Sequence, residues 1–425
     1  MNETLHIWLN DVHVADLEDA GMGTVSLQYT ADAVERYGLG AIALSVRLPV
    51  RPDPYPAVVA QYWLDGLLPE DSVRKVLADR YRVAESDTMG LLRRIGRECA
   101  GAVVITPPDT ERPVSAGVRW LDEPVLEQTV DDLAVAPFGV GADEQVRVSL
   151  GGVQEKLVLV RDRTGRLGLP LEATPSTHIL KPAPLKPNGE ERWPGIVHGE
   201  LFAMRALRLA GVPTADVQFR QVGRRPGILV ERFDRERRDD GVVRVHQEDM
   251  CQALGISPTS KYQTALNPMS PSLAKIAGVL SSHADAPIEQ LRALARLVIG
   301  SLVLGNCDQH AKNISLLLDP EQGVRLAPAY DVVPTTALPG ASPELAMRIG
   351  EEAFVDDLSD EALVAELGAW DVGERAARRM IDGALDRLEP AIEDAREQVA
   401  DEAGDHEVLH RAVEQARERI SRLRR

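Results

Sequence analysis

The chain has 425 residues, 44% of them hydrophobic, and its 66 acidic side chains outnumber its 48 lysines and arginines, for a formal net charge of −18. This charge excludes a protein whose whole surface binds nucleic acid, and no apolar run approaches the ~20 residues of a membrane helix. The opening residues MNETLHIWLN lack the basic and apolar regions of a signal peptide. Three widely spaced cysteines predict buried free thiols, so we expect a cytoplasmic protein.

The first predicted unit, residues 1–110, mixes strands and helices. LHIWLNDVHVADL at 5–17 alternates on either side of Asn-Asp and predicts a β-hairpin. Apolar residues at helical spacing then predict two short helices, at 68–83 and 87–96. The stretch PPDTERPVSAG at 107–117 is rich in proline and polar residues, which indicates a linker after this unit.

A β-rich unit, residues 111–235, is predicted next. Short β-branched or aliphatic runs indicate its strands: VRVS, KLVLV, THILK and GILVERF. One helix interrupts them at 196–211, ending at a glycine with a proline just beyond. The rest of the chain, 236–425, is predicted to be an all-helical lobe, so the fold class is α+β with a β-rich lobe before a helical one.

A burst of polar residues, GNCDQHAKN, directly follows the apolar run LARLVIGSLVLG. Within it Asp308 and Asn313 are five residues apart, and Asp331 follows in LAPAYDVVP. Phosphoryl transfer needs one carboxylate to accept the proton of the attacking hydroxyl, and an amide oxygen with a second carboxylate to hold magnesium on the phosphates. The D-x-x-x-x-N spacing fits that chemistry, although alone it is also common by chance.

The β-rich unit contains further residues that suit a nucleotide site. Gly151 and Gly152 lie between two predicted strands, with Lys156 just after them, and such glycines let backbone N–H groups approach phosphate; a plain hairpin turn is the alternative. Lys181 ends the strand THILK and would reach the phosphates, or it would lie at a sheet edge. Glu200, in the first turns of the following helix, would pair with it or occupy a surface position.

The strand GILVERF leads into a connector between the predicted lobes. Main-chain groups of Glu231, Arg232 and Phe233 would meet the adenine ring there. Each of these features is weak alone, but together they follow the order found in kinases: glycine turn, strand lysine, helix glutamate, connector, D-x-x-x-x-N and a final aspartate. The order favours a nucleotide-dependent kinase.

Six segments together resemble the HipA-type serine/threonine kinases, the toxins of bacterial toxin–antitoxin pairs: SLGGVQEK, THILKP, ERFDR, HQEDMCQALG, NCDQHAKN and AYDVVP. The resemblance implies a two-lobed protein-kinase-like fold, related to lipid kinases, with an extra N-terminal subdomain. It implies ATP and Mg²⁺ as cofactors, Asp308 as the catalytic base, and Asn313 and Asp331 as magnesium ligands. It also implies a set of ATP-binding residues: Gly151, Gly152, Val153, Gln154, Glu155, Lys156, Lys181, Glu231, Arg232, Phe233, His310, Asn313, Tyr330 and Asp331.

The resemblance also implies regulation and partners. Ser149, immediately before the glycines, matches the family's autophosphorylation site; on the sequence alone it reads as an ordinary turn serine. Phosphate there would expel the glycine loop by like-charge repulsion. The implied partners are a small helix-turn-helix antitoxin like HipB, operator DNA through that complex, and a protein substrate such as an aminoacyl-tRNA synthetase. No membrane partner is expected.

Three other interpretations compete with a protein kinase. A metal hydrolase could be built from Asp308, His310 and Asp331, but it leaves Lys181 and Glu200 without a role. A non-catalytic regulator that binds only antitoxin and DNA would not need the acidic set. A small-molecule or lipid kinase would share the D-x-H-x-x-N form, although no basic amphipathic segment suits a membrane surface.

Overall fold

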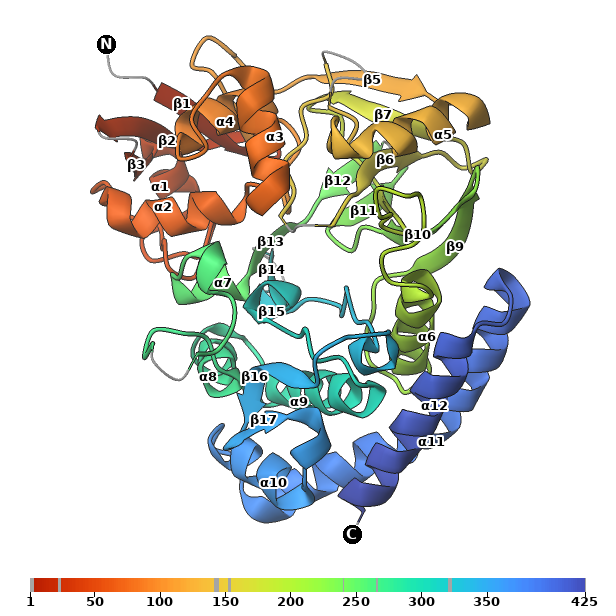
Figure 1. Ribbon diagram of the computed structural model, residues 1–425. Helices are drawn as coiled ribbons and strands as arrows, with labels where there is room; N and C mark the ends of the chain where they lie inside the picture. Colours follow the sequence, from red (N-terminus) through yellow and green to blue (C-terminus); the bar gives the residue numbers. More distant parts are fainter. Residues whose placement is uncertain are drawn as a thin grey trace.

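The computed structural model describes residues 4–21, 24–140, 145–151, 154–239, 241–264, 267–319 and 323–424. Among these residues, the N-terminal part forms a four-stranded antiparallel sheet in the order β3-β2-β1-β4 (Figure 1). Its strands are β1 (Thr4–Leu9), β2 (Val12–Gly21), β3 (Thr24–Tyr29) and β4 (Val103–Thr106). The predicted opening hairpin is therefore confirmed as β1 and β2.

Four helices pack beside this sheet in the described residues: α1 (Ala31–Tyr37), α2 (Ala57–Gly66), α3 (Asp71–Tyr81) and α4 (Thr88–Ile95). The two predicted helices are α3 and α4. Asp87 caps α4 because its side chain accepts a hydrogen bond from the N–H of Gly90, a donor that the first turn would leave unpaired.

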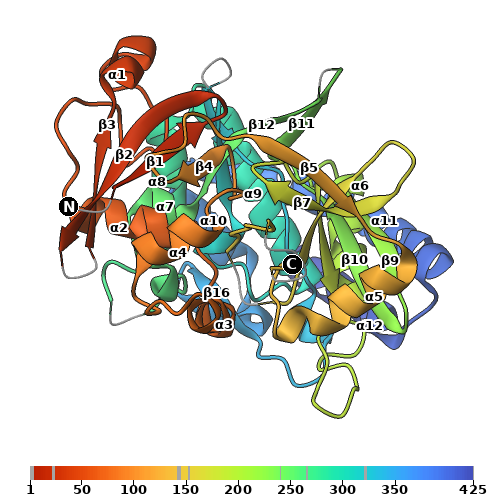
Figure 2. The same ribbon diagram turned by 90° about the horizontal axis from the view of Figure 1, so that it is seen from above.

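A second, six-stranded sheet in the described residues has the order β5-β7-β6-β8-β10-β9 and lies beside the first when viewed from above (Figure 2). Its strands are β5 (Ser115–Trp120), β6 (Leu157–Arg161), β7 (Leu167–Glu172), β8 (His178–Pro182), β9 (Val217–Val222) and β10 (Arg225–Glu231). The helices α5 (Glu123–Asp131) and α6 (Ile196–Leu209) belong to this region. The start of β5 falls inside the predicted linker.

The predicted strand VRVS is wrong. Residues 145–151 form no named strand, and Val148 makes only an isolated parallel bridge to Glu98. The N–H of Ser149 donates to the carbonyl of Glu98 at 2.8 Å. The segment therefore crosses beside the N-terminal unit instead of forming a hairpin with β6.

The C-terminal lobe is mostly helical but contains strands, which corrects the expectation of an all-helical lobe. Its helices are α7 (Met250–Leu254), α8 (Leu273–His283), α9 (Pro287–Leu304), α10 (Asp360–Gly368), α11 (Glu374–Ala403) and α12 (Glu407–Leu423). Its strands are β11 (Arg235–Arg238), β12 (Gly241–Arg244), β13 (His246–Asp249), β14 (Ser315–Asp319), β15 (Gly323–Leu326), β16 (Glu344–Ile349) and β17 (Glu352–Phe354). In the sheet β13-β14-β15 the central strand, β14, begins two residues after the segment 305–313.

Two large hydrophobic cores support the molecule. One joins the N-terminal unit to β6, β7 and β8, and the other joins α6 and β10 to the C-terminal helices. The three cysteines, Cys99, Cys251 and Cys307, are free and buried, as predicted. None of the helices in the described ranges is both long enough and apolar enough for a membrane span.

Candidate active site

Helix α9 leads directly into the polar segment 305–313. Its last eight residues are all buried in the C-terminal core and, except for a glycine and a serine, they are apolar. Gly305 ends the helix in the left-handed region, with φ +80°, and its N–H donates to the carbonyl of Leu302 at 3.0 Å. A Cβ at Gly305 would collide with Thr336 Oγ1, so glycine is required both for the turn and for the close approach.

The segment after Gly305 is held by its own hydrogen bonds. Asn313 Nδ2 donates to the carbonyl of Asp308 at 3.0 Å, and Gln309 Nε2 donates to the carbonyl of Asn313 at 2.9 Å. The side chain of Asn306 accepts from the N–H of Asp308 at 3.1 Å. These bonds close residues 306–313 into a rigid loop, which fixes the direction of the Asp308 carboxylate.

Asp308 has one side-chain neighbour that the sequence did not indicate. The hydroxyl of Tyr262 donates to Asp308 Oδ1 at 3.0 Å, and the Tyr262 ring meets His310 edge-on with centroids 5.2 Å apart. Tyr262 lies 46 residues before Asp308 in a segment without regular structure, so neither periodicity nor spacing could have identified it.

An ion pair triad joins the two lobes. Lys181 at the end of β8 donates to Glu200 Oε1 of α6 at 2.8 Å and to Asp331 Oδ1 at 2.5 Å. Lys181 and Glu200 are buried, whereas Asp331 is partly open. Asp331 has φ +57°, a conformation rare outside glycine, and it directs the carboxylate of a C-lobe residue toward a lysine of the β-sheet. The structure thus brings together three residues, the first and last of which are 150 positions apart in sequence.

Within this triad Lys181 and Asp331 stabilise each other's charge, whereas burial, with the charge of Asp331, raises the pKa of Glu200. Burial opposes the ammonium of Lys181, but the carboxylates of Asp331 and Glu200 raise its pKa above the ordinary value. Burial likewise opposes ionisation of Asp331, yet Lys181 holds the pKa of that carboxyl at about 2. Both groups therefore stay charged across the physiological range, which suits a site for phosphate and a divalent cation.

At Asp308 and His310 the pKa shifts favour the neutral form of each side chain. Burial raises the pKa of Asp308, Tyr262 opposes that rise through its hydrogen bond, and the negative charge of Asp331 adds to it. Burial also lowers the pKa of His310 to about 4, so its imidazole is neutral near pH 7. A carboxylate with a raised pKa is a better proton acceptor than an ordinary surface aspartate.

A second charged cluster connects the loop 305–313 to the N-terminal unit. Lys312 Nζ contacts Asp249 Oδ2 at 2.7 Å and Glu70 Oε1 at 3.9 Å, and Lys261 Nζ contacts Glu70 Oε2 at 2.8 Å. The predicted site omitted Lys312, although its place between Asp308 and Asn313 was a signal that could have found it. Glu70 precedes α3, so part of the site environment comes from the N-terminal unit.

The predicted glycine loop is only partly described. Gly152 and Val153 lie outside the described residues. Gly151 accepts a hydrogen bond from Lys156 Nζ at 2.6 Å through its carbonyl, and a Cβ on Gly151 would lie 3.3 Å from Lys312 Nζ. Burial, together with the nearby ammonium of Lys181, lowers the pKa of Lys156 to about 8. Gly151 and Lys156 therefore lie beside the loop 305–313.

The two remaining loop residues and Ser149 have separate surroundings. Gln154 is half-buried, and Glu155 pairs with Arg225 at 2.9 Å. Ser149 is fully buried, and its hydroxyl donates to the carbonyl of Leu67 at 2.6 Å. Its hydroxyl is thus covered in this conformation, and residues 145–151 would have to move before it could be phosphorylated.

Two backbone N–H groups of the predicted connector already bond to carbonyl groups within the fold. The N–H of Glu231 donates to Asp216 and that of Arg232 donates to Thr177, at 2.8 and 2.9 Å. The Arg232 side chain points into a buried network with Asp234 and Glu98, not toward the triad. The Phe233 ring, in contrast, lies 5.4 Å from the ring of Tyr330, next to Asp331.

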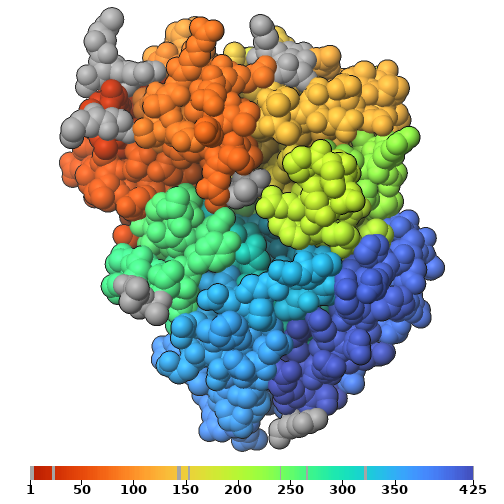
Figure 3. Space-filling model, viewed as in Figure 1, coloured from red at the N-terminus to blue at the C-terminus, as the bar shows by residue number. Residues whose placement is uncertain are grey.

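The Tyr330 hydroxyl donates to the carbonyl of Lys312 and bonds to the Ser315 hydroxyl, both at 2.6 Å, which ties the residue before Asp331 to the loop 305–313. The face where the two halves meet is hollowed between the green and yellow-green surfaces, with teal atoms of the α9–β14 region at its floor (Figure 3).

The donor set fits Mg²⁺. The amide N–H₂ of Asn313 donates to the carbonyl of Asp308, so its amide oxygen is left as a possible metal ligand. Asp331 supplies an ionised carboxylate. Mg²⁺ prefers such oxygen ligands and retains several waters. Nδ1 of His310 is buried and has no hydrogen-bond partner among the described residues. An unpaired polar atom of this kind is consistent with a ligand that binds beside it.

Two protein-family models match this chain. Residues 148–394 match the family model of the HipA-like C-terminal domain, and residues 5–106 match that of the HipA N-terminal domain. A serine/threonine-protein kinase toxin HipA from Shewanella oneidensis is 30% identical over 366 residues, covering 82% of this chain and 79% of that protein. Y4mE of Sinorhizobium fredii is 34% identical over 404 residues, covering 93% of each chain.

A solved structure matches over nearly the whole length. It is the toxin–antitoxin complex of HipA, HipB and operator DNA from Shewanella oneidensis MR-1, with a TM-score of 0.83 at 26% identity, covering 99% of this chain and 97% of that one. Fold and relatives together define an α+β, two-lobed serine/threonine protein kinase. The chain belongs to the HipA family, as its sequence motifs predicted.

Proposed function

We propose that this chain is an ATP- and Mg²⁺-dependent kinase toxin whose transfer chemistry takes place between Lys181, Asp331 and the loop 305–313. The observation that carries the proposal is the triad, in which Lys181 lies 2.8 Å from Glu200 and 2.5 Å from Asp331 across the interlobe boundary. Mg²⁺, held by Asn313 and Asp331, would neutralise charge on the phosphates when bound. Lys181 would place the phosphate chain, and Glu200 would hold the lysine in position.

Asp308 is proposed as the general base. Its carboxylate accepts the proton of a substrate hydroxyl as the hydroxyl oxygen forms a bond to the γ-phosphorus of ATP. The bond from that phosphorus to the bridging oxygen breaks, and ADP leaves with the electron pair. The raised pKa of Asp308 and its fixed loop favour this proton transfer.

We also propose that the family's regulation applies here. Ser149 would be the site of autophosphorylation, and a phosphate there would prevent residues 145–151 from returning to the buried position that Ser149 now occupies. The HipA of the matched complex assembles with HipB and operator DNA, which supports a HipB-like antitoxin and DNA as partners of this chain. The target proposed from the resemblance is a translation protein such as an aminoacyl-tRNA synthetase.

Labelled ATP tests both parts. The purified chain should incorporate label in a Mg²⁺-dependent way, and Asp308→Ala and Asp331→Ala should lose it by at least about a hundredfold. Intact-mass and peptide measurements should place the phosphate on Ser149, and Ser149→Ala should remain unmodified. Self-labelling that persists in both aspartate variants would contradict the proposed transfer site, whereas phosphate on another residue would contradict only the regulatory part.

A further inference from the structure

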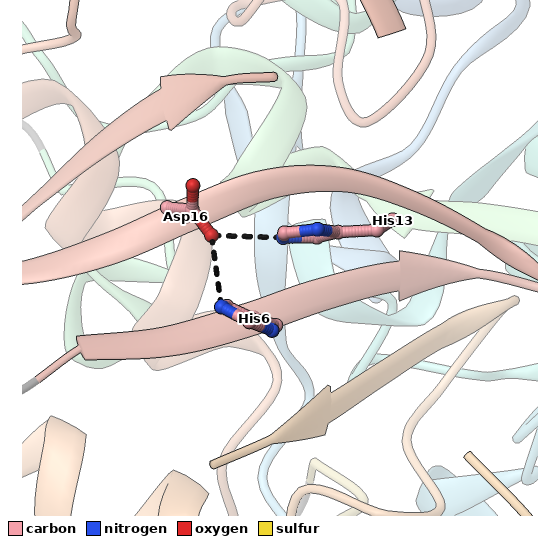
Figure 4. Close-up of side chains that lie close together, drawn as sticks. All are labelled: His6, His13 and Asp16. Carbon is pink, nitrogen blue, oxygen red and sulfur yellow. Dashed lines mark hydrogen bonds and ion pairs between the residues drawn. The ribbon is translucent and has the colours of Figure 1, made fainter. Parts of the chain in front are cut away.

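Two histidines and an aspartate lie together on one face of the hairpin β1–β2, in the N-terminal unit. His6 stands directly opposite Asp16 across the two strands, and Trp8 stands opposite His13. Positions 13 and 16 of a regular strand would face opposite sides of the sheet. The pairing shifts between Ile7 and Trp8, and this β-bulge turns His13 and Asp16 to the same face (Figure 4).

The three side chains converge on a small volume. Asp16 Oδ1 is 2.8 Å from His13 Nε2 and 3.5 Å from His6 Nε2, and all three ligand atoms lie within 4.8 Å of one another. The centroids of the His6 and His13 imidazole rings are 4.1 Å apart, and the ring planes are tilted by 32°. Tetrahedral zinc with bonds near 2.1 Å sets neighbouring ligand atoms about 3.4 Å apart, so small side-chain adjustments suffice.

The cluster is accessible and preorganised. Between 20% and 34% of each of the three side chains is exposed, so an ion could enter from solvent. The backbone beneath is fixed by the buried core of the sheet and by Trp8, whose indole N–H donates to Thr106 Oγ1 of β4 at 2.9 Å. Among the described residues, no other group of histidine, cysteine and acidic side chains has metal-ligand spacing.

We propose that His6, His13 and Asp16 bind one Zn²⁺ ion, with water in the fourth position. Two imidazoles and a carboxylate suit zinc, whereas Mg²⁺ prefers an all-oxygen set. The ion would bridge β1 and β2 across the bulge and so stabilise the N-terminal hairpin. This site is separate from the kinase site and does not depend on the proposed transfer chemistry.

Zinc titration of the full-length protein, with Mg²⁺ in excess to occupy oxygen-rich sites, tests the proposal. We expect one Zn²⁺ per chain, a rise in melting temperature on binding, and affinity at least about tenfold weaker in His13→Ala and Asp16→Asn. The matched control is His410→Ala, because His410 pairs with Asp405 at 2.9 Å without a third ligand. This control should bind zinc like the unsubstituted chain.

A footprint on the unsubstituted protein covers the case in which a variant fails to fold. Zinc should protect His6 and His13, but not His410, from diethylpyrocarbonate, as read by peptide mass spectrometry. Absence of saturable zinc binding, equal binding in the His13 and Asp16 variants, or equal modification of His6 with and without zinc would each overturn the site.

Discussion

Asp308 illustrates how a few neighbours tune one carboxylate. Burial and the charge of Asp331 raise its pKa, while Tyr262 works against this by donating a hydrogen bond to the ionised form. A general base must be ionised to accept a proton, so in the role proposed for Asp308 the rate of transfer should fall as the pH drops through its raised pKa. The acidic limb should therefore lie above ~3.9, the ordinary aspartate value.

Replacing Tyr262 by phenylalanine should move that limb further upward. The change removes the hydrogen bond that favours the ionised carboxylate, so the pKa of Asp308 rises and activity is lost at a higher pH. We expect a displacement of about one pH unit, since a hydrogen bond to a charged group contributes ~1.5–3 kcal/mol and water will replace part of it. Single-turnover rates between pH 4 and 8, roughly the range spanning both forms, measure it.

Tyr37→Phe serves as the control for this experiment, because Tyr37 ends α1 in the N-terminal unit. It should leave the pH profile in place. An acidic limb that is unchanged in Tyr262→Phe, or displaced to lower pH, would show that the hydroxyl does not act on the base.

At the scale of elements, sequence patterns predicted the strands and helices with clear periodicity. The predicted strands KLVLV and THILK and the helix that contains Glu200 are confirmed. Each has a clear apolar pattern with turn residues at its ends. The strands β13 to β15 were missed: SLLLD is a short apolar run, and periodicity alone does not separate such a run from a buried helix. VRVS lies apart from β6 because it packs instead beside Glu98 of the N-terminal unit.

The candidate site was likewise predicted only in part from the sequence. Asp308, Asn313 and Asp331 were predicted from spacing, and the structure gathers Asp331 with Lys181 and Glu200. Tyr262, Glu70 and Asp249 could not be predicted, because tertiary packing alone brings them to the catalytic segment.

Gly305→Ala should damage both stability and activity. The left-handed conformation costs an alanine ~1–2 kcal/mol, and its Cβ would also collide with Thr336. Thermal unfolding should occur at least about 3 °C lower, and transfer should slow about a hundredfold as the loop shifts.

The matched control is Gly278→Ala in the middle of α8, where a Cβ meets no atom within 4 Å. This variant should be as stable as the unsubstituted chain or more stable by up to ~1 kcal/mol. Equal melting temperatures for the two variants would contradict the role assigned to Gly305.

For the whole molecule, buried charges fasten the N-terminal unit to the kinase lobes. Glu98 is fully buried and pairs with Arg235 at 2.7 Å, with Arg244 at 2.5 Å and with Arg232 at 3.3 Å. Burial opposes its ionisation, but the three guanidinium groups hold the pKa of Glu98 at about 2. Removal of one member of such a network would leave uncompensated charge in the interior.

Glu248 makes a contact of a different kind between the same parts. Its Oε1 accepts the N–H of Val46 at 2.8 Å, while its Oε2 is buried with no hydrogen-bond partner in the described part of the chain. Burial raises the pKa of Glu248 to about 8. In the unfolded chain a glutamate ionises near ~4.3. The folded state therefore binds the extra proton, and stability should fall as the pH rises from ~4.3 to about 8.

Glu248→Gln should flatten this dependence, because the neutral amide does not ionise on either side of the transition. Melting temperatures between pH 6 and 9, roughly spanning the folded-state value, should fall less in the variant than in the unsubstituted chain. The exposed Glu361→Gln of α10 is the control and should match the unsubstituted profile. Parallel curves for Glu248→Gln and the unsubstituted chain would contradict a buried, protonated Glu248.

In the proposed kinase, one cleft would bind Mg²⁺-nucleotide through Asp331 and transfer phosphate through Asp308. Titration of a non-hydrolysable ATP analogue with and without Mg²⁺, on Asp308→Asn and Asp331→Asn side by side, tests it most directly. Asp308→Asn should bind within about threefold of the unsubstituted chain while losing transfer, because a general base contributes chiefly to the chemical step. Asp331→Asn should lose the Mg²⁺-dependent part of nucleotide binding. Full Mg²⁺-dependent affinity in Asp331→Asn would contradict the proposed role of Asp331 as a magnesium ligand.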